Sequence, residues 1–164
     1  MKAVNIHEGI DSTLMLLESR LKANYNKAAI TIVKEYGDLP LVECYAGQLN
    51  QVFMNVLTNA IDALEESQNR RDDSAETTIR IHTGILVPDR IFIRITDNGL
   101  GMDKTVQHQL FNPFFTTKPV GKGTGMGMSI SYQIITEKHS GRLSCISEVG
   151  KGTEFSIEIP IRQH

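Results

Sequence analysis

The order of helical and β-rich segments predicts an α+β fold, a mixed sheet of about five strands covered on one face by three helices. Helical patterns cover residues 7–21, 46–66 and 126–139, and β-rich runs lie between and after them. Neighbouring runs are spaced as hairpins, and the helices are able to share one face. We therefore expect a two-layer α/β sandwich rather than a doubly wound parallel sheet.

The helices are predicted from apolar residues that recur at helical spacing. In residues 7–21 these are Ile10, Leu14, Leu17 and Leu21, which form an amphipathic pattern. The longest helix, residues 46–66, should be largely buried, because most of its sides are apolar. Its apolar residues are Leu49, Val52, Phe53, Val56, Leu57, Ala60, Ile61 and Leu64. The third helix stops at Ser140-Gly141, where the glycine suits a left-handed cap.

The β-rich runs alternate apolar and polar residues, imperfectly, and are bounded by turn-forming residues. They cover residues 30–36, 77–87, 90–96, 142–148 and 153–161. Pro88-Asp89 joins the second run to the third, and Gly150-Lys151-Gly152 joins the last two. Residues 67–76 are rich in Asp, Arg, Ser and Asn and have nothing to bury, so we predict a solvated loop there.

Length, charge and cysteine content limit the classes of protein that fit. A chain of 164 residues fits one domain, and its 17 basic and 19 acidic residues leave a net charge of -2. This balance predicts neither nucleic-acid binding nor direct contact with an anionic membrane. Cys44 and Cys145 are far apart without nearby metal ligands, so neither a disulfide framework nor a zinc site is expected. With no signal peptide or spanning run, we expect a cytoplasmic location, although a parent protein could be membrane-anchored.

A line of amides on the long helix is the first chemical signal. Gln51, Asn55 and Asn59 fall at i, i+4 and i+8, on one side of a helix that is otherwise apolar. Buried amides are costly without partners, and a magnesium-bound nucleotide offers them a cation and phosphate oxygens. The alternative is that these amides cap nearby loops or face water, and the helix alone favours that alternative.

Two glycine-containing segments add to this signal. Asp97 precedes Asn98-Gly99-Leu100-Gly101-Met102 at the end of a strand. An ionised Asp only accepts hydrogen bonds, so it would pair with the amine of adenine and repel the carbonyl of guanine. The alternative is a tight turn without a ligand.

The second segment has four glycines, Gly121, Gly123, Gly125 and Gly127, which run into the third helix. Backbone amides at a helix N-terminus favour phosphate. The spacing matches neither a P-loop nor a dinucleotide-binding unit, so a different phosphate cradle is predicted. The alternative is a flexible hinge, which would leave the entropy cost of four glycines unexplained.

In this order, the segments resemble the ATP-binding superfamily shared by histidine kinases, type II topoisomerases, mismatch-repair ATPases and heat-shock chaperones. The matching segments are residues 55–60 for the Asn-rich box, 97–101 and 121–127 for two glycine boxes, and 111–115 for the Phe box. Residues 113–118 followed by 123–129 are particularly similar to histidine kinases of the nitrogen-regulator type. Gly152-Thr153 resembles a third glycine element, although a hairpin turn explains it equally well. The resemblance spans nearly the whole chain and implies a Bergerat-type sandwich.

The resemblance implies a role for each matched residue. Asn59 and Asn55 would hold Mg²⁺, and Asn55 and Lys118 would take part in catalysis. Asp97 would bind adenine, while Gly99 and Gly101 would let the base lie close. Further nucleotide contacts would come from Met102, Thr117, Gly123, Thr124, Gly125, Met126 and Gly127. Residues 102–124 would act as a mobile lid.

The resemblance also implies the reaction. Topoisomerases and chaperones carry a water-activating Glu where this chain has Asn55, which is no general base. Phosphoryl transfer from ATP to a protein histidine fits better than hydrolysis, because it depends on positioning and charge neutralisation. Of the five histidines, only His7-Glu8 resembles an acceptor box, and the residues after it, Gly9-Ile10-Asp11, lack the expected basic residue and proline.

We therefore expect residues 1–164 to be one ATP-binding catalytic domain of a two-component sensor histidine kinase. Its partners would be a separate histidine-bearing dimerisation domain of the same kinase, and a response regulator whose receiver Asp takes the phosphoryl group next. Two alternatives stay open: a binding module switched by nucleotide, and an anti-sigma-like serine kinase. The intact boxes argue against the first, and the Phe box argues against the second.

Overall fold

The computed structural model describes residues 1–23, 28–70, 76–112 and 127–163, and it confirms the predicted α+β sandwich. Five strands form the main sheet, in the spatial order β2-β4-β5-β7-β6. Their bounds are Ile30–Tyr36 for β2, Thr77–Leu86 for β4, Arg90–Asp97 for β5, Arg142–Glu148 for β6 and Gly152–Pro160 for β7. β2 and β4 run parallel and the other pairs run antiparallel, so the sheet is mixed as predicted.

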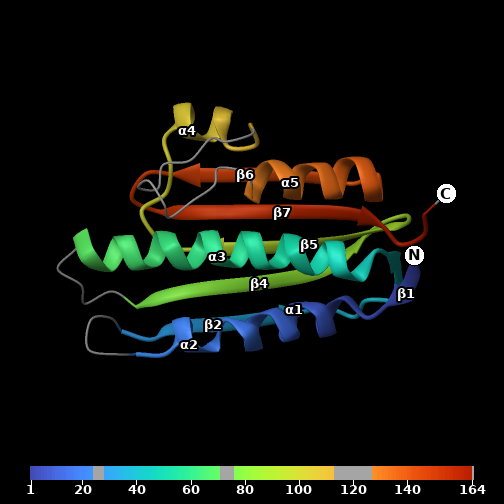
Figure 1. Ribbon diagram of the computed structural model, residues 1–164, viewed down its shortest axis with the longest axis horizontal. Coiled ribbons are helices and arrows are strands. Elements are labelled where there is room, and N and C mark those ends of the chain that lie inside the picture. The colour runs from blue at the N-terminus through green and yellow to red at the C-terminus, as the bar shows by residue number, and fades with distance from the viewer. Residues whose placement is uncertain (24–27, 71–75, 113–126, 164) are drawn as a thin grey trace.

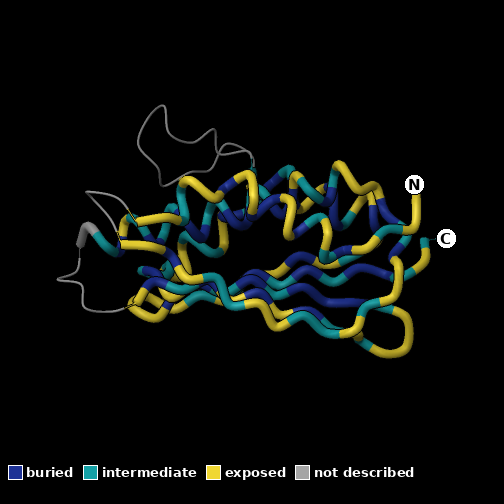
Figure 2. Tube along the Cα trace, turned by 90° about the horizontal axis from the view of Figure 1, so that it is seen from below, coloured by how far each residue is buried: buried dark blue, intermediate teal, exposed yellow. Residues whose placement is uncertain are grey.

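Three helices cover one face of this sheet. They are α1 (Ile6–Leu16), α3 (Ala46–Arg70) and α5 (Gly127–Gln133), and α3 lies between the other two (Figure 1). The buried residues lie between the helical layer and the strands (Figure 2). All eight apolar residues predicted for the long helix are at most 2% exposed, which confirms that α3 is the centre of the core. Each large side chain buried there stabilises the fold by about 1.5–3 kcal/mol.

Alternation along the strands separates the covered face from the open one. On β4, Ile79 and Ile81 are fully buried against the helices, whereas Arg80 and His82 are exposed on the other face. This period of two is what a sheet with one packed face requires. Within the described parts of the chain, none of the helices is long and apolar enough to cross a membrane.

The predicted loop at residues 67–76 is wrong in its first part, because α3 continues to Arg70. Ser67 is 3% exposed, and the amide nitrogen of Gln68 donates to Thr77 Oγ1 at 3.1 Å. Polar composition indicated a loop, but packing against the start of β4 keeps these residues helical. Contacts with distant residues override local propensity here.

Several short elements were not predicted. β1 (Lys2–Val4) and β3 (Val42–Cys44) form a small antiparallel sheet, and α4 (Lys104–Gln109) begins after the capping residue Asp103, whose carboxylate accepts from Val106 N at 2.9 Å. The predicted first helix is divided at Leu17 into α1 and α2 (Glu18–Leu21). Three-residue strands and single helical turns are too short for a period to emerge from the sequence.

The predicted third helix continues from α5 into one π-helical stretch, η1 (Ile134–Lys138), before the predicted stop. The buried ring of His139 joins this end to Tyr45, the residue before α3. Its Nε2 accepts from Tyr45 N at 3.0 Å, and its Nδ1 lies 2.9 Å from the carbonyl of Ile134. Because Nε2 accepts, the proton is on Nδ1 and the ring is neutral. Burial, which lowers the pKa of His139, favours the same neutral form.

Candidate functional site

A cavity of about 470 Å³ lies where three stretches distant along the chain meet. α3 contributes its C-terminal half, and the other walls are the segment that follows β5, α4 and the turn between β6 and β7. These elements lie at the same end of the sheet (Figure 1). The cavity is lined by Asn59, Asp62, Ala63, Glu66, Leu100, Gly101, Met102, Asp103, Val106, Val149, Gly150 and Thr153. Three predicted nucleotide ligands, Asn59, Gly101 and Met102, are therefore brought together.

Asp97 ends β5 next to this cavity and is 3% exposed. It is not among the described residues that line the cavity, whereas its neighbour across the sheet, Thr153, is. Burial raises the pKa of Asp97 to about 6, although backbone hydrogen bonds from Gly99 and Thr153 oppose the shift. At neutral pH the carboxylate is therefore mostly ionised and acts only as an acceptor.

The glycines around Asp97 are required by the protein's own backbone. A Cβ on Gly99 would lie 3.0 Å from the carbonyl oxygen of Ala63 and from Asp97 Oδ1. Gly101 and Gly152 have φ of +74° and +121°, and a Cβ on either would collide with a carbonyl of Glu148 or Asp97. Tight packing thus explains why positions 99 and 101 hold glycine, and this explanation is separate from the predicted close approach of adenine.

Asn55 joins the long helix to the start of α5. Its Nδ2 donates to the carbonyl of Gly127 at 3.0 Å and to Ser131 Oγ at 3.1 Å. Two predicted site residues, Asn55 and Gly127, are thus in direct contact although 72 positions separate them. Because the nitrogen is committed to α5, the oxygen is the atom of this amide that could ligate a cation. Gln51, the first residue of the amide line, is exposed.

Six predicted ligands lie outside the described residues, namely Thr117, Lys118, Gly123, Thr124, Gly125 and Met126. The same holds for residues 113–124 of the predicted lid and for the larger part of the Phe box. Phe111, the first residue of that box, stacks on Tyr132 of α5 with ring centroids 5.2 Å apart.

Sequence reasoning missed the polar side chains that hold the site together. Asn98 accepts from Thr78 N at 2.9 Å and donates to Glu76 O at 2.7 Å, so it ties the turn after Asp97 to the start of β4. On the other side, Ser147 Oγ accepts from Met102 N at 2.8 Å. The Asp-Asn-Gly sequence was a usable signal for Asn98, whereas no local pattern marks Ser147.

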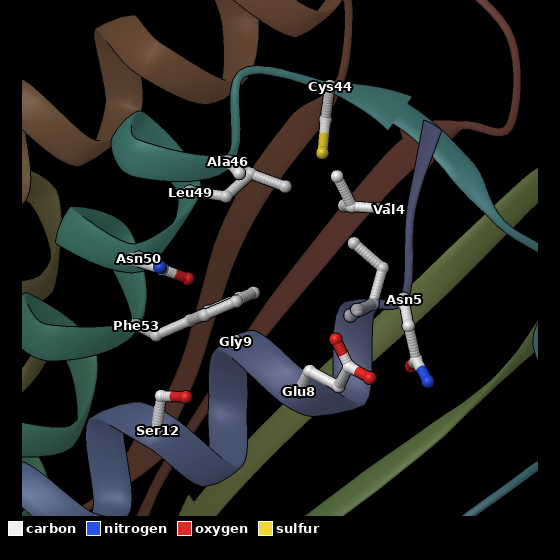
Figure 3. Close-up of a pocket in the computed structure, with 11 residues that line it drawn as sticks. Val4, Asn5, Glu8, Gly9, Ser12, Cys44, Ala46, Leu49, Asn50 and Phe53 are labelled. Atoms are coloured by element: carbon white, nitrogen blue, oxygen red, sulfur yellow. The ribbon is translucent and has the colours of Figure 1, made fainter. Parts of the chain in front are cut away.

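A second cavity, of about 260 Å³, lies between the starts of α1 and α3 (Figure 3). Asn50 and Phe53 of α3 face Gly9 and Ser12 of α1, and Cys44 closes one end. Burial raises the pKa of the Cys44 thiol to about 11, so it stays protonated and is a weak nucleophile. None of the described residues that line this cavity belongs to the predicted site.

Comparison with known proteins identifies the family of this chain. Residues 45–163 match the family model described as histidine kinase-, DNA gyrase B-, and HSP90-like ATPase. The matched range begins just before α3 and ends after β7, so it contains Asn55, Asn59, Asp97 and the second glycine segment.

Similar proteins include two bacterial kinases. Sporulation kinase E of Bacillus subtilis is 39% identical over 127 residues, which are 77% of this chain and 16% of that protein. Sensor kinase CckA of Brucella abortus is 37% identical over 160 residues, which are 93% of this chain and 17% of that protein. The chain thus spans about a sixth of the length of these relatives.

Among solved structures, the catalytic domain of histidine kinase ThkA superposes with a TM-score of 0.80 at 27% identity, over 99% of this chain and 98% of that one. The chain therefore belongs to the histidine kinase-, DNA gyrase B-, and HSP90-like ATPase family, in the branch formed by the ATP-binding domains of sensor histidine kinases.

Proposed function

We propose that this domain binds Mg-ATP in the cavity beside Asp97 and transfers the γ-phosphoryl group to a histidine. The acceptor histidine would stand on a separate dimerisation domain, and a response-regulator receiver would take the phosphoryl group next. The observation that carries the proposal is the meeting of Asn59, Gly101 and Met102 around one cavity beside a buried carboxylate. A structure similar to this chain in fold, that of ThkA, is described in complex with a response regulator.

Adenine recognition would rest on Asp97. Its carboxylate is held in place by the Gly99 amide, which donates to Oδ1 at 2.9 Å. The second oxygen would accept the exocyclic amine of adenine, and an acceptor there would repel the carbonyl of guanine. Because Asp97 is buried, the local dielectric constant is low, and hydrogen bonds to charged groups are strongest there. The burial would therefore increase the difference in affinity between adenine and guanine.

Magnesium would be held by the amide oxygens of Asn59 and Asn55 together with the nucleotide phosphates. Both groups are hard oxygen ligands, which Mg²⁺ prefers, and Mg²⁺ commonly uses few protein ligands when phosphate is present. The contacts of Asn55 Nδ2 with α5 suit this role, because they turn the amide nitrogen away from the cation. Bound magnesium would supply charge neutralisation on the transferring phosphoryl group.

The remaining phosphate ligands are proposed from the sequence resemblance. Lys118 would neutralise charge in the transition state, and the amides of residues 123–127 would cradle the phosphates with Thr117. Catalysis would depend on positioning and electrostatics, since Asn55 stands where hydrolysing relatives have a general base. We also propose that residues 1–164 act as one catalytic domain, of the nitrogen-regulator type, without a phosphoacceptor of their own.

The test is transfer of label between two separate proteins. The chain is mixed with γ-labelled ATP, magnesium and a separately expressed dimerisation domain that carries the acceptor histidine. We expect acid-labile label on that histidine, and none when the histidine is replaced by Gln. ATP binding without transfer to any offered histidine domain would reject the kinase proposal and favour a nucleotide-switched module.

A further inference from the structure

A row of polar residues crosses three strands beside the cavity. Asp97 on β5 pairs in register with Thr153 on β7, and Thr153 pairs with Ser147 on β6. The three strands are neighbours in the sheet (Figure 1). Asp97 and Thr153 are 3% and 4% exposed, and Ser147 is half-buried. The row links the predicted adenine ligand to a serine that no motif marks.

Ser147 is the hub of the row. Its Oγ accepts from Met102 N at 2.8 Å, lies 3.0 Å from the carbonyl of Gly152 and is 2.7 Å from Thr153 Oγ1. Gln107 of α4 reinforces the same junction, since its Nε2 donates to the carbonyls of Met102 and Ser147, both at 3.0 Å. The rim of the cavity at Met102 is therefore tied to the β6–β7 hairpin by side chains from both sides.

Counting protons fixes the direction of these hydrogen bonds. A serine hydroxyl has one proton, and a carbonyl can only accept. Ser147 therefore donates to Gly152 O, and the bond between the two hydroxyls must use the proton of Thr153. All three contacts are satisfied only in this arrangement. Thr153 lines the cavity. Because its hydroxyl proton is used within the protein, this hydroxyl can act toward a bound ligand only as an acceptor.

We propose that Ser147 is a positioning residue for nucleotide selection, which acts by making the Thr153 hydroxyl an acceptor and by holding Met102 at the rim. This inference rests on the proposed binding of adenine beside Asp97. Asp97 and Thr153 pair in register on neighbouring strands, so the Asp97 carboxylate and the Thr153 hydroxyl would offer two acceptors to the two protons of an adenine amine. They offer no donor to the carbonyl that guanine carries at the same position.

Removing the Ser147 hydroxyl should change selectivity as well as affinity. In Ser147→Ala, Thr153 can rotate and donate its proton into the cavity, so guanine is rejected less strongly. We expect the affinity for ADP to fall about tenfold, and the ratio of ADP to GDP affinity to fall about tenfold. A purely structural role would weaken both nucleotides equally and leave the ratio unchanged.

The experiment is calorimetric titration of the folded chain with ADP, and with GDP by displacement, in magnesium buffer. Ser147→Thr keeps a hydroxyl and should stay within about twofold of wild type. Ser144→Ala removes a serine from an exposed position of the same strand and should change neither value. Wild-type selectivity in Ser147→Ala, or loss of selectivity in Ser147→Thr, would overturn the assignment.

A variant of the partner residue tests the same claim if Ser147→Ala does not fold. Thr153→Val keeps the side-chain shape and removes the hydroxyl, so it should also lower the ADP to GDP ratio about tenfold. An unchanged ratio in this variant refutes the proposal. If the wild-type chain binds neither ADP nor ATP, the proposed function itself fails. If the wild-type chain prefers ADP to GDP and the variants keep the same preference, only the role of Ser147 fails.

Discussion

Replacement of Asp97 by Asn should stabilise the fold while it weakens nucleotide binding. The carboxyl is 3% exposed and burial raises its pKa from 3.8 to about 6. One pKa unit corresponds to about 1.36 kcal/mol, so the shift corresponds to about 3 kcal/mol. A carboxyl group whose pKa is higher in the folded protein than in the unfolded chain makes its full contribution to stability below the unfolded-state pKa. This contribution is lost as the pH rises through the folded-state pKa. Ionised Asp97 thus costs the fold up to about 3 kcal/mol at neutral pH.

An Asn at position 97 has nearly the same shape and no charge to desolvate. Its oxygen can still accept from the Gly99 amide, but its amide nitrogen needs an acceptor, so we expect a gain of about 1–3 kcal/mol. The same variant should lose ADP affinity by a factor of about 10 to 100, since a hydrogen bond to a charged group contributes about 1.5–3 kcal/mol. A gain in stability together with a loss of function is the expected sign of a strained site.

The assay is urea unfolding followed by circular dichroism between pH 5 and pH 8, with calorimetry of ADP binding at pH 7.5. The stability difference between Asp97→Asn and wild type should shrink as pH falls below about 6, because wild-type Asp97 then becomes protonated. Asp89→Asn is the matched control, since Asp89 is an exposed residue of the β4–β5 turn. A variant that is less stable than wild type at pH 8 and binds ADP normally would show that the Asp97 charge neither destabilises the fold nor binds adenine.

Three further predictions follow from the same site. Asn59→Ala should weaken ADP binding with magnesium while leaving magnesium-free binding nearly unchanged, and equal losses in both buffers, measured by calorimetry, would contradict metal ligation. Asn55→Ala removes the amide that donates to the Gly127 carbonyl and the Ser131 hydroxyl. Urea unfolding should show that this variant loses about 1–3 kcal/mol of unfolding free energy. Gln51→Ala, at an exposed position of the same helix, should change the unfolding free energy by less than about 0.5 kcal/mol. The affinity for ADP should fall as the pH drops through about 6, because protonated Asp97 becomes a donor toward the adenine amine. Titrations from pH 5 to 8 that show constant affinity would exclude Asp97 as the residue that binds adenine.

Local patterns were sufficient to predict most of the fold. The period of apolar residues in α3 is long and strong, and the five strands of the main sheet fall at the predicted runs. The prediction was wrong or incomplete where an element is very short or where polar residues are buried. Ser67 is polar yet buried at the end of α3, and β1 and β3 are three residues each and exist by pairing with one another.

The candidate site was predicted only as separate pieces. The sequence indicated that Asn59, Asp97 and Gly101 matter, because amides, a carboxylate and glycines have recognisable chemistry in their order along the chain. It did not indicate that Gly101 is packed against a carbonyl of Glu148. Nor did it indicate that Asn98 ties its own turn to the start of β4.

Residues that are close along the chain were enough to predict the fold class, the positions of the five strands of the main sheet and the family. Which distant groups share hydrogen bonds depends on how the helices and strands pack. Ser147 meets Met102 across 45 positions and Asn55 meets Gly127 across 72. A hydrogen bond requires donor and acceptor within about 3 Å, and that closeness arises only when strands and helices are packed together.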